Sequence, residues 1–291
     1  MSVAIVTDTT AYLPSSVVAE RGLRVVPLHV VIAGREFSEG VDVTTAEVAA
    51  ALRAFRPVST SRPAPSAFLQ AYEDAAAAGA SAIVSIHISA DMSSTVESAR
   101  LAAQQAPIPV TVVDSRSLGM AMGYAVLAAA DAAAAGEDAQ SVAALALSRC
   151  KASTVVFYVD TLEHLRRGGR IGAASAFLGS ALAIKPILSL RDGHISALEK
   201  VRTSARALSR LEELAVEAAL KADDGCDGVD IAVQHLDSLT RAESLAERLR
   251  ERAASAHEVR IVELGAVVGA HVGPGTLAVA VVPRIAPASA R

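Results

Sequence analysis

Short runs of β-branched residues alternate with Ala-rich stretches along the first half of the chain, and this alternation most constrains the fold. Strand-like runs lie at residues 3–6, 82–86 and 110–113, and helical runs lie at 64–78, 94–105 and 118–135. Strands separated by helices of this length favour a parallel sheet that is covered on both faces. The first half therefore predicts an α/β domain with a mainly parallel sheet.

One segment departs from this alternation. Within residues 25–37, two strand-like runs flank the dipeptide Ala33-Gly34, with no helical stretch between them. Two such runs joined by a short Gly-containing turn are typical of a β-hairpin. We expect a small hairpin inserted after the first helix.

From about Ser153 the strands can pair antiparallel. Residues 187–190 and 194–201 flank Asp192-Gly193, which tolerates the positive φ of a tight hairpin turn. Further strands are expected at 154–159, 229–234, 259–263 and 277–282, and helices at 174–184, 204–221 and 238–252. A chain of 291 residues favours two cores over one, so we predict an N-terminal domain of residues 1–152 and a C-terminal α/β domain of residues 153–291 with a mixed or antiparallel sheet.

Composition excludes several classes of protein. The chain has 27 Lys and Arg against 31 Asp and Glu and no basic run, so we expect no nucleic-acid partner. No apolar stretch reaches the roughly 18 residues that span a bilayer, and the N-terminus lacks a basic signal region, which favours a cytoplasmic protein. Cys150 and Cys226 have no second Cys or His at metal-ligand spacing, so we expect neither a disulfide nor a metal.

Hydroxyl side chains are concentrated in three segments, at residues 7–10, 59–63 and 89–95. Each precedes a predicted helix, where hydroxyls and free backbone N–H groups can hold an anion together. Ser and Thr at such positions commonly serve only as helix N-caps. Three clusters at the carboxyl ends of parallel strands favour a shared anion site instead.

The second half adds Gly-rich and basic segments. They comprise residues 162–172, Lys185-Pro186, Arg202-Thr203, and residues 269–275 around His271. No phosphate-binding loop, dinucleotide motif or G-x-S-x-G motif occurs. A Ser93/His271 pair leaves open a hydrolase of acyl esters or thioesters, although no acid is evident to orient the His.

Together these segments resemble the DegV family of bacterial fatty-acid-binding proteins. Residues 7–9 resemble the family's S-D-S, residues 60–63 resemble T-S-Q-P, and residues 89–99 resemble S-x-x-x-S-G-T-Y-x-S-A. The Gly-rich and basic segments of the second half follow the family's order, so the resemblance covers nearly the whole chain. Arg62, Ser94 and Val96 depart from the usual Gln, Gly and aromatic residue, and the loss of the aromatic is expected to reshape the tunnel.

The resemblance implies two α/β domains with a ligand tunnel between them. It implies a protein that catalyses nothing itself and acts as the carrier subunit of fatty acid kinase. Such a carrier buries a long-chain fatty acid and presents its carboxylate to the kinase catalytic subunit, which forms an acyl-phosphate for phospholipid synthesis. No cofactor is implied beyond the bound fatty acid, and membrane contact is at most peripheral, for lipid exchange.

The resemblance also assigns residues. Thr60, Ser61, Ser93 and His271 are expected to contact the fatty acid carboxylate. Further candidates for contact with the ligand or a partner are Ser94, Thr95, Arg170 and Arg202. Phe177 is a candidate on different grounds, because it lies on the apolar side of the helix expected at 174–184, which lines the tunnel or belongs to the ordinary core. The basic segment Arg166 to Arg170 is a candidate for contact with the lipid or the kinase, or for a solvated face.

Overall fold

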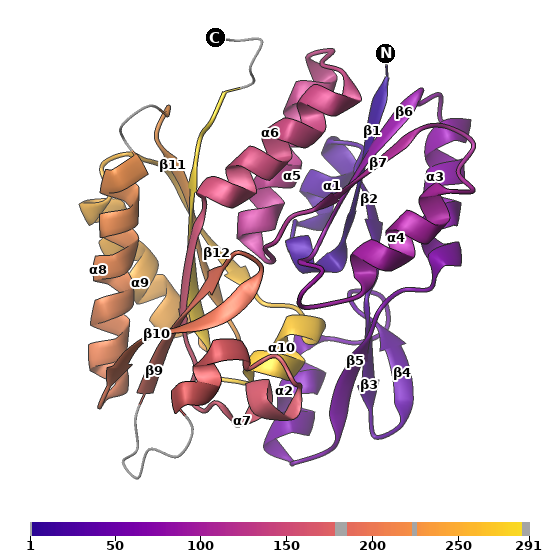
Figure 1. Ribbon diagram of the computed structural model, residues 1–291. Coiled ribbons are helices and arrows are strands. Elements are labelled where there is room, and N and C mark those ends of the chain that lie inside the picture. The colour runs from indigo at the N-terminus through magenta and orange to yellow at the C-terminus, as the bar shows by residue number, and fades with distance from the viewer. Residues whose placement is uncertain (1, 178–184, 223–225, 287–291) are drawn as a thin grey trace.

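The computed structural model describes residues 2–177, 185–222 and 226–286, which contain three β-sheets (Figure 1). The first sheet has the order β2-β1-β6-β7 and is parallel throughout. Its strands are β1 (Val3–Asp8), β2 (Arg24–Val26), β6 (Ala82–His87) and β7 (Val110–Asp114). The predicted parallel sheet is confirmed. Residues 24–26 belong to this sheet and not to the hairpin, because Pro27, which has no N–H to donate, interrupts the run.

The predicted hairpin is confirmed and is part of a three-stranded sheet of order β4-β3-β5. Its strands are β3 (His29–Ile32), β4 (Arg35–Ser38) and β5 (Val58–Ser61). Ala33 and Gly34 have φ values of 50° and 85°, the left-handed pair of a tight hairpin turn. The expectation that residues 59–61 form a loop before a helix was wrong, because β5 pairs with the free edge of β3.

The second half forms a six-stranded mixed sheet of order β10-β9-β8-β13-β11-β12, as predicted. All neighbours are antiparallel except β11 and β12. Its strands are β8 (Thr154–Tyr158), β9 (Lys185–Arg191), β10 (His194–Val201), β11 (Val229–His235), β12 (Ala256–Glu263) and β13 (Leu277–Pro283). Asp192 and Gly193 make the expected turn between β9 and β10, with φ values of 50° and 86°.

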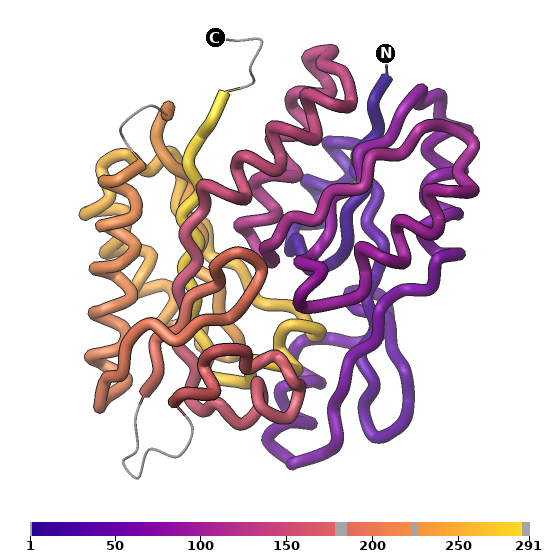
Figure 2. Tube along the Cα trace, in the orientation of Figure 1, coloured from indigo at the N-terminus to yellow at the C-terminus, as the bar shows by residue number. Residues whose placement is uncertain are grey.

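Helices and sheets alternate in layers across the molecule (Figures 1 and 2). The long helices are α3 (Pro65–Ala77), α4 (Thr95–Ala103), α5 (Met120–Ala134), α6 (Ala139–Ala152), α8 (Ser204–Ala222) and α9 (Leu239–Arg252). The pair α3 and α4 covers the outer face of the parallel sheet, and α8 and α9 cover the outer face of the mixed sheet. Helices α5 and α6 lie between the two sheets and pack on both. The domain boundary near Ala152, at the end of α6, stays a prediction.

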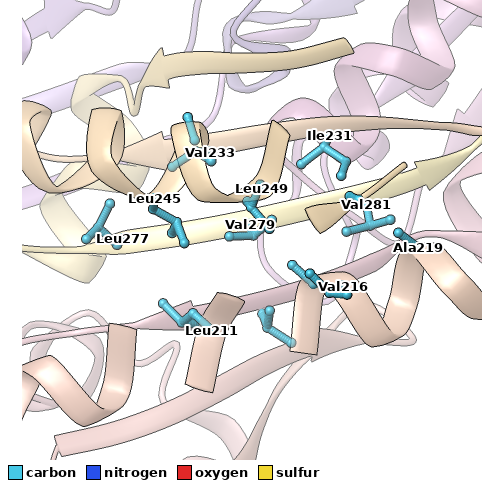
Figure 3. Close-up of a cluster of buried hydrophobic side chains, with 14 of the residues drawn as sticks. Leu211, Val216, Ala219, Ile231, Val233, Leu245, Leu249, Leu277, Val279 and Val281 are labelled. Carbon is cyan, nitrogen blue, oxygen red and sulfur yellow. The ribbon is translucent and has the colours of Figure 1, made fainter. Parts of the chain in front are cut away.

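Alternation along β13 shows how one strand serves two layers. Leu277, Val279 and Val281 face α8 and α9 in the cluster of Figure 3, whereas Ala280 and Val282 face α5. Successive side chains of a strand point to opposite faces, so an unbroken apolar strand is buried on both. The small side chains of α5 let it fit between two sheets.

Shorter elements gather with the hairpin sheet at one end of the molecule (Figure 1). They include α2 (Thr45–Arg53), α7 (Glu163–Arg167) and α10 (Ala266–Val272); η1 (Thr9–Ala11) and α1 (Ser15–Glu20) follow β1. The helix expected at 174–184 is not α-helical where it can be seen, because Gly172–Phe177 forms the 3-10 helix η2. Residues 178–184 lie outside the described residues. None of the helices in the described ranges is long and apolar enough to cross a membrane.

A buried ion pair holds α6 against the mixed sheet. Arg149 donates to the Asp230 carboxylate at 2.6 Å, and its Nε donates to the carbonyl oxygen of Pro283 at 3.1 Å. The side chains of Arg149 and Asp230 are 8% and 6% exposed. Arg284, which is more exposed, also donates to the Asp230 carboxylate, at 3.1 Å. Removing Arg149 takes away the more buried of these two cations and leaves the Asp230 charge less well compensated, so the pair is sensitive to truncation.

We predict that Arg149→Ala lowers the free energy of unfolding by about 3 kcal/mol, measured by urea denaturation. Arg21→Ala is the matched control, because Arg21 pairs with Asp131 at the surface, where the side chains are 38% and 58% exposed. The control should lose less than about 1 kcal/mol. Equal losses in the two variants would contradict the assigned importance of burial.

Candidate functional site

A cavity of about 340 Å³ lies between the hairpin sheet, the carboxyl end of β6, α7 and α10. Its apolar walls come from both halves of the chain and comprise Leu28, Ile88, Met92, Leu118, Leu165, Ile195, Val267, Val268 and Val272. Its polar lining comprises Thr60, Ser61, Arg62, Ser93, Ser94, Arg170 and His271. Apolar walls with a few convergent polar groups are typical of small-molecule sites.

The polar lining contains most of the residues expected to bind a ligand. Thr60 and Ser61 come from the end of β5, Ser93 and Ser94 from the loop after β6, and His271 from α10. The structure brings these five side chains to one cavity, together with Arg170. Their roles toward a ligand stay predictions.

His271 and Thr60 are joined across the cavity. Nε2 of His271 lies 2.8 Å from Oγ1 of Thr60, and Nδ1 is buried with no hydrogen-bond partner among the described residues. Burial, and to a smaller extent the positive charge of Arg170, together lower the pKa of His271 from 6.5 to about 4. The imidazole is therefore neutral at neutral pH.

Close packing fixes the ring of His271 from the other side. A Cβ atom at Gly168 would lie 2.1 Å from Nδ1 of His271, so only glycine fits there beside the ring. Arg170 donates to the carbonyl oxygen of Gly168 at 2.6 Å and to that of Met92 at 3.1 Å. Arg170 thus ties the Gly-rich segment that packs on His271 to the loop that carries Ser93.

The hydroxyls differ in how they are engaged. Ser61 donates to Oε2 of Glu36 at 2.8 Å, and must release it to donate to a ligand. Oγ of Ser93 lies 2.8 Å from Oγ1 of Thr95, which is itself buried. Thr95 supports Ser93 from outside the cavity lining. Ser94 is exposed at the start of α4.

The alternative that these hydroxyls serve only as helix N-caps does not fit the second and third hydroxyl segments, residues 59–63 and 89–95. The N-cap of α3 is Ala64, which makes no side-chain cap, and Ser94 at the N-cap of α4 makes none either. The first cluster behaves differently: Asp8 caps η1 by accepting from the backbone N–H of Thr10. Two of the three clusters therefore meet at the cavity.

The first cluster is a structural network behind the cavity. Asp8 is fully buried, and its Oδ2 lies 3.0 Å from both Nδ1 of His87 and the backbone nitrogen of Ile88. Thr7 donates to the carbonyl oxygen of Ile86 at 2.8 Å. These contacts join the ends of β1 and β6 and so position Ile88, which lines the cavity. Only the juxtaposition of the two strands shows His87 as a partner of Asp8.

Two candidates lie elsewhere. Arg202 is exposed in the turn before α8, beside Glu199 and Arg206. Phe177 packs beneath Lys200, whose Nζ is 4.6 Å from the ring centroid. Neither is part of the cavity lining: Arg202 follows β10, and Phe177 packs on the outside of the apolar cluster that includes Leu165 and Ile195.

Residues outside the predicted set hold the cavity walls in place. Oε1 of Glu39 accepts from the N–H of Val267 at 2.8 Å, and so anchors the start of α10, with Gly265 leaving room for the carboxylate. Ser89 donates to the carbonyl oxygen of Gly193 at 3.0 Å, which docks the β9–β10 turn and places Ile195. Nothing in the sequence around Glu39 distinguishes it from an acidic residue at the surface. The Gly193 turn was predicted, but its docking partner was not.

No group of three or more His, Cys, Asp or Glu side chains suited to a metal ion occurs in the described part of the chain.

Comparison with known proteins gives a consistent result. A model of the DegV family, described as uncharacterised proteins, matches residues 2–284. A DegV domain-containing protein of Streptomyces coelicolor is 49% identical over 282 residues, covering 97% of this chain and 99% of its own length.

Two solved structures are similar throughout. A DegV family protein from Thermus thermophilus, described for its fatty acid binding, is 34% identical with a TM-score of 0.87, covering 97% of this chain and 100% of its own. DegV from Bacillus subtilis, described as a fatty acid binding protein, is 31% identical with a TM-score of 0.88, covering 98% and 100%.

The lowered pKa of His271 predicts a pH dependence of stability. Between pH 6.5 and pH 4 the unfolded chain binds a proton at this residue and the folded protein does not, so stability falls as the pH falls. Relative to His271→Gln, the wild type should lose about 3 kcal/mol from pH 7 to pH 4, measured by urea unfolding at each pH. A difference between the two proteins that stays constant with pH would contradict a neutral, buried imidazole.

Proposed function

The chain belongs to the DegV family, and on this premise we propose that it binds one long-chain fatty acid and presents the carboxylate to a fatty acid kinase. One observation carries the proposal: a single cavity joins apolar walls from both halves of the chain to a cluster of hydroxyls and a neutral imidazole. The fatty acid binding described for the Thermus and Bacillus relatives supports it.

The apolar walls would supply affinity. Burying about fourteen methylenes at roughly 0.8 kcal/mol each gives on the order of 11 kcal/mol before the cost of ordering the acyl chain. Leu165, Ile195 and Val268 line the cavity and also belong to a larger apolar cluster of the second half. An acyl chain that enters between these side chains would leave water and contact the apolar cluster instead.

The polar groups would orient the acid. Hydroxyls and a neutral imidazole can donate to a carboxylate without a fixed charge having to be buried beside it. Thr60 and His271 share one hydrogen bond, in which one group donates and the other accepts, so both side chains are positioned before the ligand arrives. One of them can donate to the carboxylate while this bond is kept, and Ser93, which shares a hydrogen bond with Thr95, would add a further donor.

Presentation to a kinase fits the exposure of the polar end. Arg62 and Ser94 line the cavity and are exposed, so the carboxylate would lie near the protein surface. In the kinase step a carboxylate oxygen would attack the γ-phosphorus of ATP; the new O–P bond forms, the bond to the bridging β–γ oxygen breaks, and ADP leaves. The acyl-phosphate would then serve phospholipid synthesis in the cytoplasm.

Hydrolysis of acyl esters is the second candidate, and the geometry favours it less. A Ser/His hydrolase needs the imidazole hydrogen-bonded to the nucleophile and held by an acid. Here Nε2 of His271 faces Thr60, Ser93 faces Thr95, and Nδ1 of His271 has no partner within the described segments.

We predict that Thr60→Val and Ser93→Ala each weaken fatty acid binding by roughly tenfold, because each removes a hydrogen bond to a charged group. Displacement of a fluorescent fatty acid measures the affinity, and mass spectrometry of denatured protein measures the lipid retained through purification. Ser66→Ala, at an exposed position of α3, is the control and should behave as the wild type.

Failure of the wild type to take up fatty acid would overturn the proposal. Cleavage of acyl esters by the protein alone, without ATP and abolished by Ser93→Ala, would favour the hydrolase instead.

The kinase role predicts a surface that can be separated from the lipid site. Arg166 and Arg167 are exposed, pair with Glu163 and lie outside the cavity lining. Combined Arg166→Glu and Arg167→Glu should lower kinase-coupled acyl-phosphate formation at least fivefold, because the charge of this face is reversed, and leave lipid content unchanged. Loss of lipid in this variant would assign the segment to the lipid site.

A further inference from the structure

The charge of the cavity lining differs from that of the whole chain. The protein has a formal net charge of -4, yet within the described part of the chain the cavity is lined by Arg62 and Arg170 and by no Asp or Glu. Arg170 is half-buried and donates hydrogen bonds to two carbonyl oxygens, which carry no net charge. The polar end therefore holds two cations without an acid in its lining.

Arg62 is the more available of the two. It follows β5 directly after Ser61, is exposed, and makes no hydrogen bond, ion pair or ring contact with any residue in the described ranges. The acid near this point, Glu36 on β4, accepts from Ser61 and does not line the cavity. Arg62 is free to bind an anion at the outer end of the cavity.

The hydroxyls and His271 are sufficient for a carboxylate, which carries one negative charge. A guanidinium beyond them would meet the part of a head group that extends further out. An Arg side chain is suited to this, because its planar fork matches two oxygens of a phosphate group. An acyl-phosphate has its phosphoryl group in that outer position and carries a larger negative charge than the acid.

We propose that Arg62 determines specificity for a dianionic head group, so that the protein holds an acyl-phosphate more tightly than the parent fatty acid. This proposal rests on the proposed fatty acid binding. Preference for the phosphorylated form would shift the equilibrium between the two bound species toward the acyl-phosphate by the same factor. The protein would then help to retain the product of the kinase step.

Stable analogues test the proposal. Dodecyl phosphate, dodecyl sulfate and dodecanoate share one acyl length, and the phosphate and sulfate share a tetrahedral head group. At pH 8 the phosphate monoester carries close to two negative charges, because its second pKa is about 6, whereas the sulfate carries one. Displacement of a fluorescent fatty acid, with each ligand below its micelle concentration, gives the affinities.

Coulomb energy is proportional to the ligand charge, so the logarithm of the loss should double from sulfate to phosphate. Arg62→Gln should weaken the binding of dodecyl sulfate about threefold and the binding of dodecyl phosphate about tenfold, as expected for an exposed charge. Arg62→Lys keeps the charge without the fork and should lie between the wild type and Arg62→Gln. Arg100→Gln changes the net charge equally at an exposed position outside the cavity lining and should leave the phosphate-to-sulfate ratio at its wild-type value.

The outcomes distinguish a failure of the proposed fatty acid binding from a failure of the role assigned to Arg62. A wild type that binds none of the three ligands overturns the proposed function, and the role of Arg62 with it. A wild type that binds all three, with the phosphate-to-sulfate ratio unchanged in Arg62→Gln, overturns the assignment of Arg62 alone. A ratio that falls about threefold in Arg62→Gln, and not in Arg100→Gln, supports it.

Discussion

The hydrogen bond between Thr60 and His271 joins residues that are 211 positions apart in the chain, and the polar end of the cavity depends on it. Thr60 lies on the last strand of the hairpin sheet, and His271 lies on the short helix α10 of the second half. Neither element could hold its side chain in place alone. Glu39 anchors the start of α10, and Gly168 leaves space for the imidazole ring, so the pair is fixed from both sides.

Electrostatics at this point follow from burial. The imidazole loses solvent and lies near Arg170, so its pKa falls and it stays neutral, able to donate or accept a hydrogen bond without adding charge. Arg170 binds backbone carbonyls that belong to opposite sides of the cavity. The guanidinium of Arg170 thus connects parts of the protein to each other, whereas the neutral hydroxyls and imidazole are available to bind a ligand. Arg62, which has no such partner among the described residues, is the cation that remains available.

The layered core explains why the cavity lies where it does. Helices α5 and α6 fill the space between the parallel and mixed sheets with small side chains, and the ion pair of Arg149 and Asp230 fixes α6 on the mixed sheet. The hairpin sheet, α7 and α10 lie below α5 and α6 in the view of Figure 1. Apolar side chains from both halves line the space that is left there.

Sequence patterns were sufficient for features that depend on neighbouring residues. Alternating strand and helix runs predicted the parallel sheet, the strands around Asp192-Gly193 predicted antiparallel pairing in the second sheet, and the dipeptides Ala33-Gly34 and Asp192-Gly193 predicted both hairpin turns, because periodicity and positive φ are local properties. Family motifs named the hydroxyls and the His that line the cavity, and they also named Arg202, which lies outside it. The helix expected at 174–184 named Phe177, which lies outside the lining as well. Contacts between distant segments determine that residues 58–61 form a strand, that Asp8 bonds to His87, and that Ile195 and Val268 face a cavity. The sequence spacing of an apolar residue is the same whether its side chain packs in the core or lines a cavity. Packing between distant segments determines which of the two occurs.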